Sequence, residues 1–187
     1  TESMDKIFDY YQSKGIKSVY FSNQDTRPFI KFGEQVFDNV YRRCFRFGMM
    51  TSFMALTSKG KDGITKLVDR GLTFLLVALE SLNDKTLDRV NRRARRKLME
   101  DTLKILYDLK VTVTSTYIIC FEEDTAESIR EDKKKIIDLG VTFCLFNIYM
   151  PLPGTPVYFD YKSRGLLNDF DWTHWTGNHL LWKHDRI

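Results

Sequence analysis

Short apolar runs alternate with amphipathic stretches along most of the chain. Five runs of aliphatic, β-branched and aromatic residues have the length of buried strands, and they occupy residues 17–21, 50–56, 74–79, 112–119 and 142–149. Between these runs, apolar residues recur three and four positions apart, a spacing that predicts helices. The predicted helices cover residues 34–46, 62–70, 98–109, 124–139 and 157–164, with one more at the start of the chain, closed by Gly15, and a short one that ends near Arg92.

The order of these elements predicts the fold class. Helices and strands that alternate one by one, joined by short loops, form right-handed βαβ units around a parallel sheet. Five strands are too few to close an eight-stranded barrel. We therefore predict an α/β fold, a parallel sheet with alternating helices that forms a partial TIM-type (β/α) barrel arc of about five strands over residues 1–167. Residues 168–187, rich in Trp and His, are expected to pack on this arc or extend from it.

Composition narrows the class of protein. The 187 residues are 43% hydrophobic and 29% charged, which is ordinary for a soluble globular domain, and a formal net charge of +4 does not by itself indicate nucleic acid binding. No apolar run approaches the roughly 18 residues that a membrane span needs. Cys44, Cys120 and Cys144 lie far apart, which suits a reducing compartment. Cys44 is expected on the apolar face of a helix and Cys144 within a strand.

These features also set expectations about location and partners. No charged-then-apolar signal segment opens the chain, so we expect a cytoplasmic protein that acts on a small-molecule substrate, without nucleic acid or a membrane. The chain starts at Thr1 without an initiator Met and enters a helix almost at once, so we expect a piece of a longer protein. The exposed edges of its sheet would allow such a fragment to self-associate.

The most suggestive polar residues follow the third predicted strand. Glu80 and Ser81 end that apolar run, Asn83 and Asp84 can cap a short helix, and Arg92 comes twelve positions after Glu80. The carboxyl ends of parallel strands open into the crevice where α/β proteins bind ligands. Glu80 and Arg92 could therefore hold a zwitterion, because the carboxylate takes an ammonium group and the guanidinium a carboxylate. The alternative is a salt bridge that ties the helix to the rim of the sheet.

Other polar groups have simpler explanations. The remaining strand ends carry Ser22, Asn23, Gln24, Asp25, Thr57, Ser58, Cys120, Glu122, Glu123, Asp124, Asn147 and Tyr149. Solvated loops and helix caps would explain Asp25, Ser58, Asp124 and Thr125. The basic run at residues 92–97 is typical of a solvated face, and no aromatic residues are interleaved to support RNA binding. His174, His179 and His184 recur five apart, which is not a familiar metal-binding spacing.

Four segments resemble the radical S-adenosylmethionine (SAM) enzyme family, three of them with recognisable motifs. Residues 71–92, GLTFLLVALESLNDKTLDRVNR, look like the family's fourth-strand segment, in which a strand ends in an acid or amide plus Ser and a helix then reaches Asn-Arg. Residues 115–129, STYIICFEEDTAESI, are similar to the fifth-strand segment, and residues 147–159, NIYMPLPGTPVYF, closely match the sixth. Residues 4–25 resemble the first helix and second strand, so the resemblance covers most of the chain up to about Leu167.

The resemblance implies a partial barrel that binds SAM on a [4Fe-4S] cluster and cleaves it reductively to a 5′-deoxyadenosyl radical. It implies that Glu80 contacts the methionyl ammonium group and Arg92 the carboxylate, with Ser81 beside them. The other cofactor-binding residues that it implies are Ser115, Thr116 and Tyr117 on the ribose and adenine side, and Tyr149, Pro151 and Leu152 around the adenine. The PLPGTP segment is most like the branch with an N-terminal cobalamin-binding domain, which includes methyltransferases and porphyrin-ring cyclases.

The chain also departs from the family pattern. The CxxxCxxC loop that holds the cluster is missing, and the three scattered cysteines cannot replace it. Cys120 and Glu122 stand in place of a usual Gly and Pro, and Ser115 stands where a Gly is common. We therefore expect part of a catalytic core that is inactive alone without its [4Fe-4S] loop. The alternative is a degenerate, non-catalytic binding or interaction module on the same scaffold.

Overall fold

Five strands form one parallel sheet in the part of the chain that the structure describes. The computed structural model describes residues 2–22, 27–92 and 95–187, with the backbone alone for residues 27–34. The strands are β1 (Ser18–Phe21), β2 (Arg46–Thr51), β3 (Leu72–Glu80), β4 (Thr112–Ile119) and β5 (Phe143–Ile148). Each pairs in parallel with the next strand along the chain. The predicted α/β class is confirmed, whereas Asn23, Gln24 and Asp25 lie outside the described residues.

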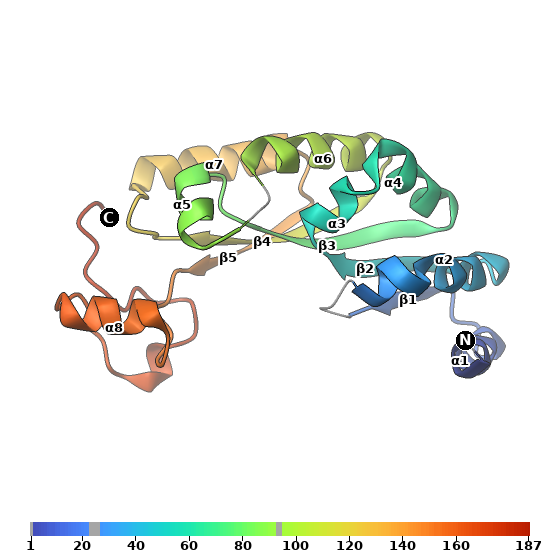
Figure 1. Ribbon diagram of the computed structural model, residues 1–187, viewed down its shortest axis with the longest axis horizontal. Coiled ribbons are helices and arrows are strands. Elements are labelled where there is room, and N and C mark those ends of the chain that lie inside the picture. Colours follow the sequence, from blue (N-terminus) through green and yellow to red (C-terminus); the bar gives the residue numbers. More distant parts are fainter. Residues whose placement is uncertain (1, 23–26, 93–94) are drawn as a thin grey trace.

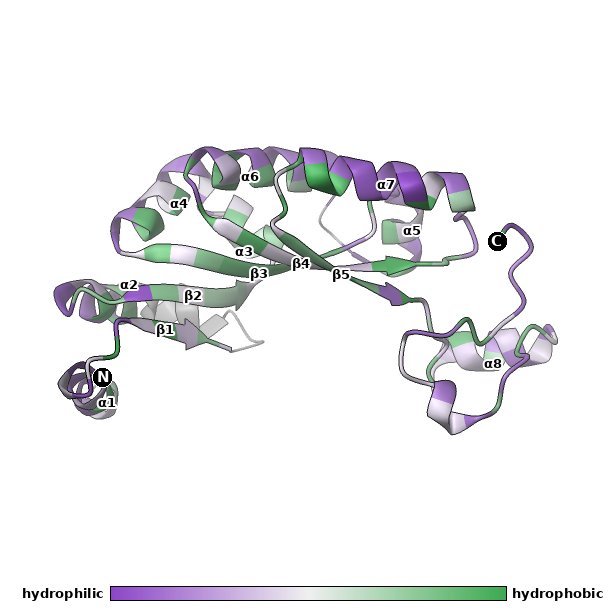
Figure 2. Ribbon diagram, turned by 180° about the vertical axis from the view of Figure 1, so that it is seen from behind, coloured by the Kyte–Doolittle hydropathy of each residue, from purple (hydrophilic) through white to green (hydrophobic). Residues whose placement is uncertain are grey.

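Most helices lie on one side of this sheet. α3 (Phe53–Thr57), α4 (Gly60–Asp69), α5 (Asp84–Arg89), α6 (Arg96–Asp108) and α7 (Ala126–Asp138) cover the same face in both opposite views (Figures 1 and 2). α1 (Glu2–Ser13) and α2 (Arg27–Arg42) lie beside β1 and β2, and α8 (Pro156–Ser163) lies beyond the end of β5 (Figure 1). Among the described residues, no helix has the length and apolar character to cross a membrane.

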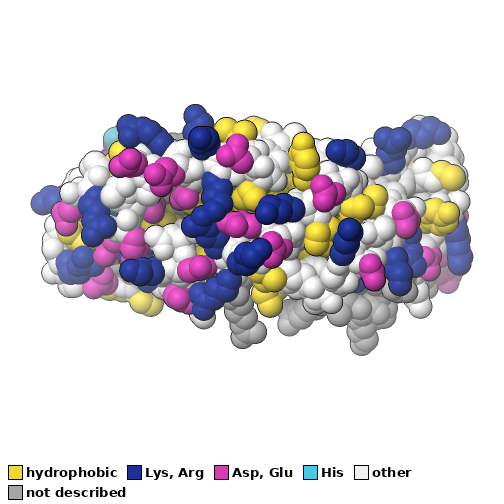
Figure 3. All heavy atoms as spheres, turned by 90° about the horizontal axis from the view of Figure 1, so that it is seen from above, with side chains coloured by type: hydrophobic (Ala, Val, Ile, Leu, Met, Phe, Trp, Pro, Cys, Tyr) yellow, Lys and Arg dark blue, Asp and Glu magenta, His cyan; other side chains and the backbone are white. Residues whose placement is uncertain are grey.

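Side-chain alternation gives the sheet a covered face and an open face. On β3, Leu75, Val77 and Leu79 are buried under the helices, while Leu76 and Ala78 point to the other side and are half-buried. The outward surfaces of the helices are largely hydrophilic (Figure 2). Acidic and basic side chains are intermingled on that outer surface (Figure 3). The hydrophobic core therefore lies between the helices and one face of the sheet.

The prediction of a strand over residues 50–56 is wrong beyond Thr51. β2 stops just before Ser52, whose hydroxyl oxygen accepts a hydrogen bond from the Ala55 N–H at 3.2 Å and caps α3. Phe53 and Leu56, three positions apart, are both buried, and this is a helical spacing. The Met and Ala content of this run does not distinguish a strand from a helix. Ser52 favours the helix, because its side chain caps the first turn.

Other expected boundaries shift as well. Thr57 and Ser58, expected after a strand, lie at the C-terminal end of α3, and Asp62, expected as a helix cap, lies in the first turn of α4. The prediction that Cys44 lies on the apolar face of a helix is also wrong. Cys44 follows α2, is exposed, and has a left-handed φ of 56° that ends the helix before β2.

Gly71 connects α4 to β3 at a point where the backbone passes very close to another segment. Its φ is +104°, a conformation that residues with a side chain rarely adopt. A Cβ atom at this position would lie 2.6 Å from the carbonyl oxygen of Phe45. The predicted end of the helix at Gly71 is confirmed, and the close approach explains why a glycine is needed here.

The chain after α8 folds back on the end of the sheet. Leu167 and Trp182 form an antiparallel bridge and pack together in a small buried cluster. The indole N–H of Trp182 donates to the carbonyl oxygen of Tyr149 at 3.3 Å. The Ile148 N–H donates to the carbonyl oxygen of Gly177 at 2.7 Å. The tail of residues 168–187 thus contacts the last residues of β5.

Candidate functional site

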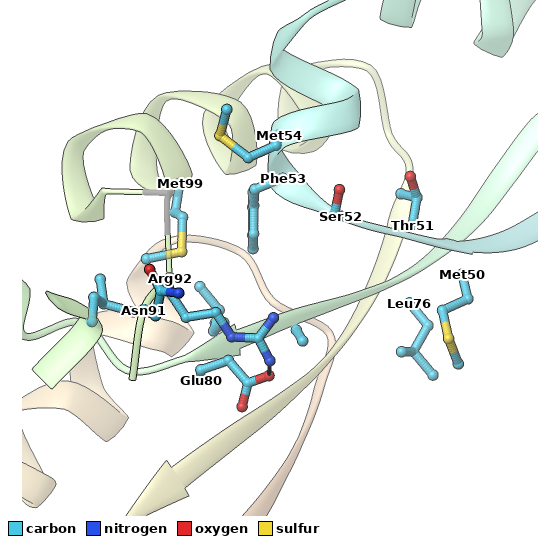
Figure 4. A pocket seen from close by; sticks show the side chains of 13 residues that line it. Met50, Thr51, Ser52, Phe53, Met54, Leu76, Glu80, Asn91, Arg92 and Met99 are labelled. Atoms are coloured by element: carbon cyan, nitrogen blue, oxygen red, sulfur yellow. Dashed lines mark hydrogen bonds and ion pairs between the residues drawn. The ribbon is translucent and has the colours of Figure 1, made fainter. Parts of the chain in front are cut away.

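Two cavities meet at the carboxyl ends of the strands. A cavity of about 690 Å³ opens where β2 and β3 end. It is lined by Met50, Thr51, Ser52, Phe53, Met54, Leu76, Ala78, Leu79, Glu80, Leu87, Asn91, Arg92 and Met99. A second cavity of about 300 Å³ lies at the ends of β3, β4 and β5 and shares Glu80, Asn91 and Arg92 with the first. The predicted pair, Glu80 and Arg92, therefore borders both cavities. Figure 4 shows the pair in the wall of the larger one.

Glu80 is directed into the cavities by the backbone at the end of β3. Its φ of +62° lies in the left-handed region, which is uncommon for a residue with a side chain. The register between β3 and β4 shifts between Ala78 and Glu80. The Ser81 N–H then donates to the carbonyl oxygen of Leu79 at 2.7 Å, which closes a tight turn. Backbone strain of this kind is concentrated at ligand-binding positions, where the surrounding structure maintains it.

Arg92 is delivered by the way in which α5 begins and ends. Asn83 caps α5 by accepting a hydrogen bond from the Lys85 N–H at 3.0 Å, as its position predicted. At the other end, Asn91 has a φ of 56°, and the Arg92 N–H donates to the carbonyl oxygen of Leu87 at 2.8 Å. This is a Schellman motif with asparagine in the left-handed position. It turns the chain back, so that Arg92 points toward Glu80 (Figure 4).

The two side chains form an ion pair in which Arg92 Nη2 donates to Glu80 Oε1. The side chain of Glu80 is 14% exposed, whereas that of Arg92 is 54% exposed. The carboxylate is thus held in the cavity wall, and the guanidinium reaches it from the solvent side. An ion pair with one highly exposed partner contributes little to stability, so a ligand can separate the charges at small cost. The geometry fits a salt bridge without a ligand and a zwitterion site with one.

Two of the predicted residues, Ser115 and Tyr117, support the backbone around Glu80 from the covered face of the sheet. Ser115 is fully buried, and its hydroxyl donates to the Val77 carbonyl oxygen at 2.7 Å and accepts from the Leu79 N–H at 3.3 Å. The side chain of Ser115 therefore joins β4 to β3 on the covered face and does not line either cavity. This contact fixes the backbone immediately before Glu80.

Tyr117 occupies the same covered face. Its hydroxyl donates to Asp132 Oδ2 at 2.6 Å and accepts from the Leu82 N–H at 2.9 Å. Burial, and then the hydrogen bond to Asp132, raise the pKa of the Tyr117 hydroxyl, so it stays protonated at neutral pH. Ser81, which is also buried, accepts a hydrogen bond from the Asn83 N–H at 3.0 Å. These contacts hold the turn that follows Glu80.

The remaining predicted residues lie on the other side of the sheet or beyond β5. Thr116 is on the open face, in register with Ala78. Tyr149 lines the smaller cavity. Pro151 is buried and Leu152 is 51% exposed in the turn after β5, and neither belongs to the two cavity linings.

Most of the cavity residues were not predicted, and two of these lie close to the predicted pair or to Tyr149. Asn91 borders both cavities, and Phe121 borders the smaller one together with Tyr149. Asn91 carried a usable signal, since an asparagine at the end of a short helix favours the left-handed position. Phe121 carried none, because its place beside Tyr149 depends on how β4 and β5 pair.

Most charges near the site are already paired. Glu122 contacts Arg89 and Arg164, and Glu123 contacts Arg89. Asp124 accepts the Phe121 N–H at 2.9 Å, which agrees with a role in loop structure. In the basic run at residues 92–97, the described cations pair with acids: Arg92 with Glu80, Arg95 with Asp88, Arg96 with Glu100, and Lys97 with Asp101. This pairing agrees with the interpretation of the run as a solvated face.

The cysteines do not form a cluster site. Cys44 is exposed, Cys120 is buried and Cys144 is partly buried, and they lie in three separate parts of the fold, after α2, after β4 and within β5. Burial, followed by the Asp124 charge, raises the pKa of Cys120 to about 11, and burial raises that of Cys144 to about 11. Among the described residues, no group of three His, Cys, Asp or Glu side chains could hold a metal ion. The donor set of the described part of the chain therefore does not fit a [4Fe-4S] cluster.

These features define an α/β protein with two cavities at the carboxyl rim of its parallel strands, the part of such folds where ligands usually bind. The family model of the Radical SAM superfamily matches residues 1–136. The chain belongs to the radical SAM superfamily, as the four sequence segments suggested.

Two characterised relatives come from Chlorobaculum tepidum. The chain is 32% identical over 129 residues to its bacteriochlorophyllide d C-8(2)-methyltransferase, covering 66% of this chain and 28% of that protein. It is 23% identical over 187 residues to its bacteriochlorophyllide d C-12(1)-methyltransferase, covering 98% of this chain and 40% of that protein. The chain thus spans less than half the length of either relative.

Solved structures share the fold at low sequence identity. The radical SAM methyltransferase TsrM from Kitasatospora setae, solved with cobalamin and a [4Fe-4S] cluster, has a TM-score of 0.66 and 12% identity over 83% of this chain and 32% of that one. The coproporphyrinogen III oxidase HemN from Escherichia coli has a TM-score of 0.58 and 13% identity over 74% of this chain and 33% of that one. The predicted barrel-like α/β arrangement is confirmed by these matches.

Proposed function

We propose that this chain forms part of the catalytic core of a radical SAM enzyme and that SAM binds where the two cavities meet. The observation that carries the proposal is the Glu80–Arg92 pair, which faces both cavities at the end of β3. The methionine end of SAM carries an ammonium group and a carboxylate. Their charges are complementary to those of Glu80 and Arg92, so the ligand replaces one ion pair by two charge-assisted contacts.

Each residue has a defined part in this proposal. Glu80, held by its turn, accepts hydrogen bonds from the ammonium group, and the more exposed Arg92 swings out to bind the carboxylate. Phe121 and Tyr149 offer aromatic surface to the nucleoside in the smaller cavity. Thr116 remains a prediction for the ribose side. The cofactor's chemistry in this family is reductive cleavage at an iron–sulfur cluster.

The cluster itself needs other ligands. Because the three cysteines lie in separate parts of the fold, two of them at least partly buried, we place the cluster ligands outside these 187 residues. We expect the chain to bind SAM weakly alone and not to cleave it. A non-catalytic binding module on the same scaffold is the second candidate, and the cysteine placement favours it.

For the whole protein we propose a cobalamin-dependent methyltransferase or a porphyrin-ring cyclase. The methyltransferase relatives act, by their names, on bacteriochlorophyllide d, and TsrM was solved with cobalamin bound. Cobalamin would be held by a separate domain. A small-molecule substrate would approach the open face of the sheet, next to the cavities.

Titration of ¹⁵N-labelled chain by NMR tests the SAM site, because amide spectra report both binding and folding. Glu80→Gln and Arg92→Met should each weaken SAM binding by about 10- to 100-fold, the usual effect of losing one charge-assisted contact. Arg95→Met is the matched control, since Arg95 pairs with Asp88 and lies outside both cavities. Its dissociation constant should stay within about twofold of the unchanged chain, as expected for an exposed pair.

A second ligand tests the nucleoside end of the site separately from the amino acid end. 5′-Methylthioadenosine carries the nucleoside of SAM but no amino acid group. Glu80→Gln and Arg92→Met should leave its binding unchanged while they weaken SAM binding. If both variants bind SAM as tightly as the unchanged chain, the zwitterion site is wrong. If the chain reconstituted in its whole protein binds SAM without cleaving it under reducing conditions, the non-catalytic module is correct.

A further inference from the structure

Arg89, in the last turn of α5, contacts elements that are far apart in the sequence. Its guanidinium carbon lies 5.6 Å from the ring centroid of Phe121 and 5.8 Å from that of Tyr149. Its terminal nitrogen atoms lie 3.7 Å from Glu122 Oε2 and 3.3 Å from Glu123 Oε2. The side chain is 33% exposed, so it is partly withdrawn from water. One cation thus joins α5 to the loop after β4 and to the end of β5.

The aromatic partners of Arg89 are themselves fixed. The rings of Phe121 and Tyr149 lie 4.5 Å apart at 35° to each other. The Tyr149 carbonyl oxygen accepts the indole N–H of Trp182. The Phe121 carbonyl oxygen lies 2.7 Å from His184 Nε2, and His184 Nδ1 accepts the Arg186 N–H at 3.1 Å, so Nε2 is the nitrogen that donates. Arg89 therefore binds to a surface that the tail already holds in place.

This contact adjoins the smaller cavity. Phe121, Tyr149 and Arg92 all line that cavity, whereas Arg89 does not. Arg89 and Arg92 belong to the same helix end, because the Arg92 N–H donates to the carbonyl oxygen of Leu87 within the Schellman motif. Any force that fixes Arg89 against the rings also fixes the distance between Arg92 and the aromatic wall.

We infer that Arg89 is a positioning residue for SAM binding, an inference that rests on the proposed function. Arg89 is in neither cavity lining, so it acts by holding Arg92 at a fixed distance from the two rings. A planar guanidinium can cover both rings and still contact two carboxylates, whereas a lysine ammonium group is a single point of charge. Lysine should therefore restore only part of the function.

A double-mutant cycle tests this inference in the same NMR titration. Arg89→Met should weaken SAM binding about fivefold, and Arg89→Lys by less, as expected from the loss of partly exposed cation–π contacts. In the Arg92→Met background, Arg89→Met should add almost nothing, because the residue that it positions is gone. Arg164→Met is the control. Arg164 shares Glu122 but contacts α8 in place of α5, so SAM binding should change by less than about twofold.

Two results would overturn the inference. Additive effects of Arg89→Met and Arg92→Met would mean that Arg89 does not act through Arg92. Hydrogen exchange provides the second, ligand-independent measurement, because Arg89→Met should speed exchange of the Arg92 amide while the amides of α7 stay unchanged. Unchanged exchange at Arg92 would refute the positioning role even if SAM bound elsewhere. A third combination separates the inference from the proposed function. Normal SAM binding by Arg92→Met, together with faster exchange of the Arg92 amide in Arg89→Met, would refute the proposed SAM site but still show that Arg89 holds Arg92 in place.

Discussion

Removing the hydroxyl group of Tyr117 should loosen the turn that carries Glu80. In Tyr117→Phe the ring remains in the core, but two hydrogen bonds are lost, one to Asp132 at 2.6 Å and one from the Leu82 N–H at 2.9 Å. Leu82 is 1% exposed, so water cannot easily replace the tyrosine as acceptor. The perturbation therefore leaves one buried backbone N–H without its partner.

The expected cost follows from these contacts. A buried donor left without a partner costs about 1–3 kcal/mol. Asp132 is only partly buried, so water can solvate its carboxylate in the variant. The loss of the hydrogen bond between Tyr117 and Asp132 therefore adds less than about 1 kcal/mol. We expect the free energy of unfolding to fall by about 2–3 kcal/mol in urea denaturation followed by circular dichroism. The matched control is Tyr107→Phe, because Tyr107 is 58% exposed and its change should cost less than about 0.5 kcal/mol.

The same hydroxyl should also give a signature at high pH. Burial and the bond to Asp132 raise the pKa of Tyr117 above its ordinary value of 10.0. Above this pH the unfolded chain releases the phenol proton while the folded chain keeps it, so the free energy of unfolding falls as pH rises. The slope attributable to this group approaches about 1.4 kcal/mol per pH unit. Tyr117→Phe should lack that slope. A loss below about 0.5 kcal/mol at neutral pH, with an unchanged alkaline slope, would refute the reasoning.

Two further predictions concern thiols and the turn before β3. Iodoacetamide at pH 7.5 should label the exposed Cys44 first, because burial raises the pKa values of Cys120 and Cys144 to about 11; peptide mass spectrometry showing faster labelling of either one would contradict this. Gly71→Ala should destabilise the protein by more than about 2 kcal/mol, whereas Gly60→Ala, also at positive φ but in open space, should cost about 1 kcal/mol in the same thermal denaturation series. Equal losses would show that the close approach at Gly71 is not important.

How well the sequence predicted each element depends on how local its signal is. The boundaries of β4 agree with the expected residues 112–119, because this run is rich in β-branched residues, which favour a strand. The end of β3 at Glu80 was also visible, since an acid after an apolar run marks a rim position. The prediction of a strand over residues 50–56 was wrong, because the mixed composition of this run did not reveal that Ser52 caps a helix.

The site divides in the same way. Glu80 and Arg92 could be predicted because each stands beside an element that the sequence already defines. The contacts of Arg89 with Phe121 and Tyr149 could not, because they join residues from three elements and appear only when β4 and β5 lie side by side. The sequence also did not show that Ser115 and Tyr117 lie on the covered face of the sheet. Alternation along a strand assigns side chains to faces, but the register between β3 and β4 shifts at Glu80, so alternation alone does not relate the two strands.

The sequential order of the strands has a consequence for how this chain folds and fails. In the described part of the sheet, every strand pairs only with its neighbours in sequence, so the elements form a linear series in which each unit depends on the adjacent one. Such a series can begin to fold at any strand pair and grow in both directions. Damage at β1 would remove one pairing and leave a continuous sheet. Damage at β3 would divide the series into two separate pairs, β1 with β2 and β4 with β5, and the strand that ends at Glu80 is therefore also the one whose loss splits the sheet evenly.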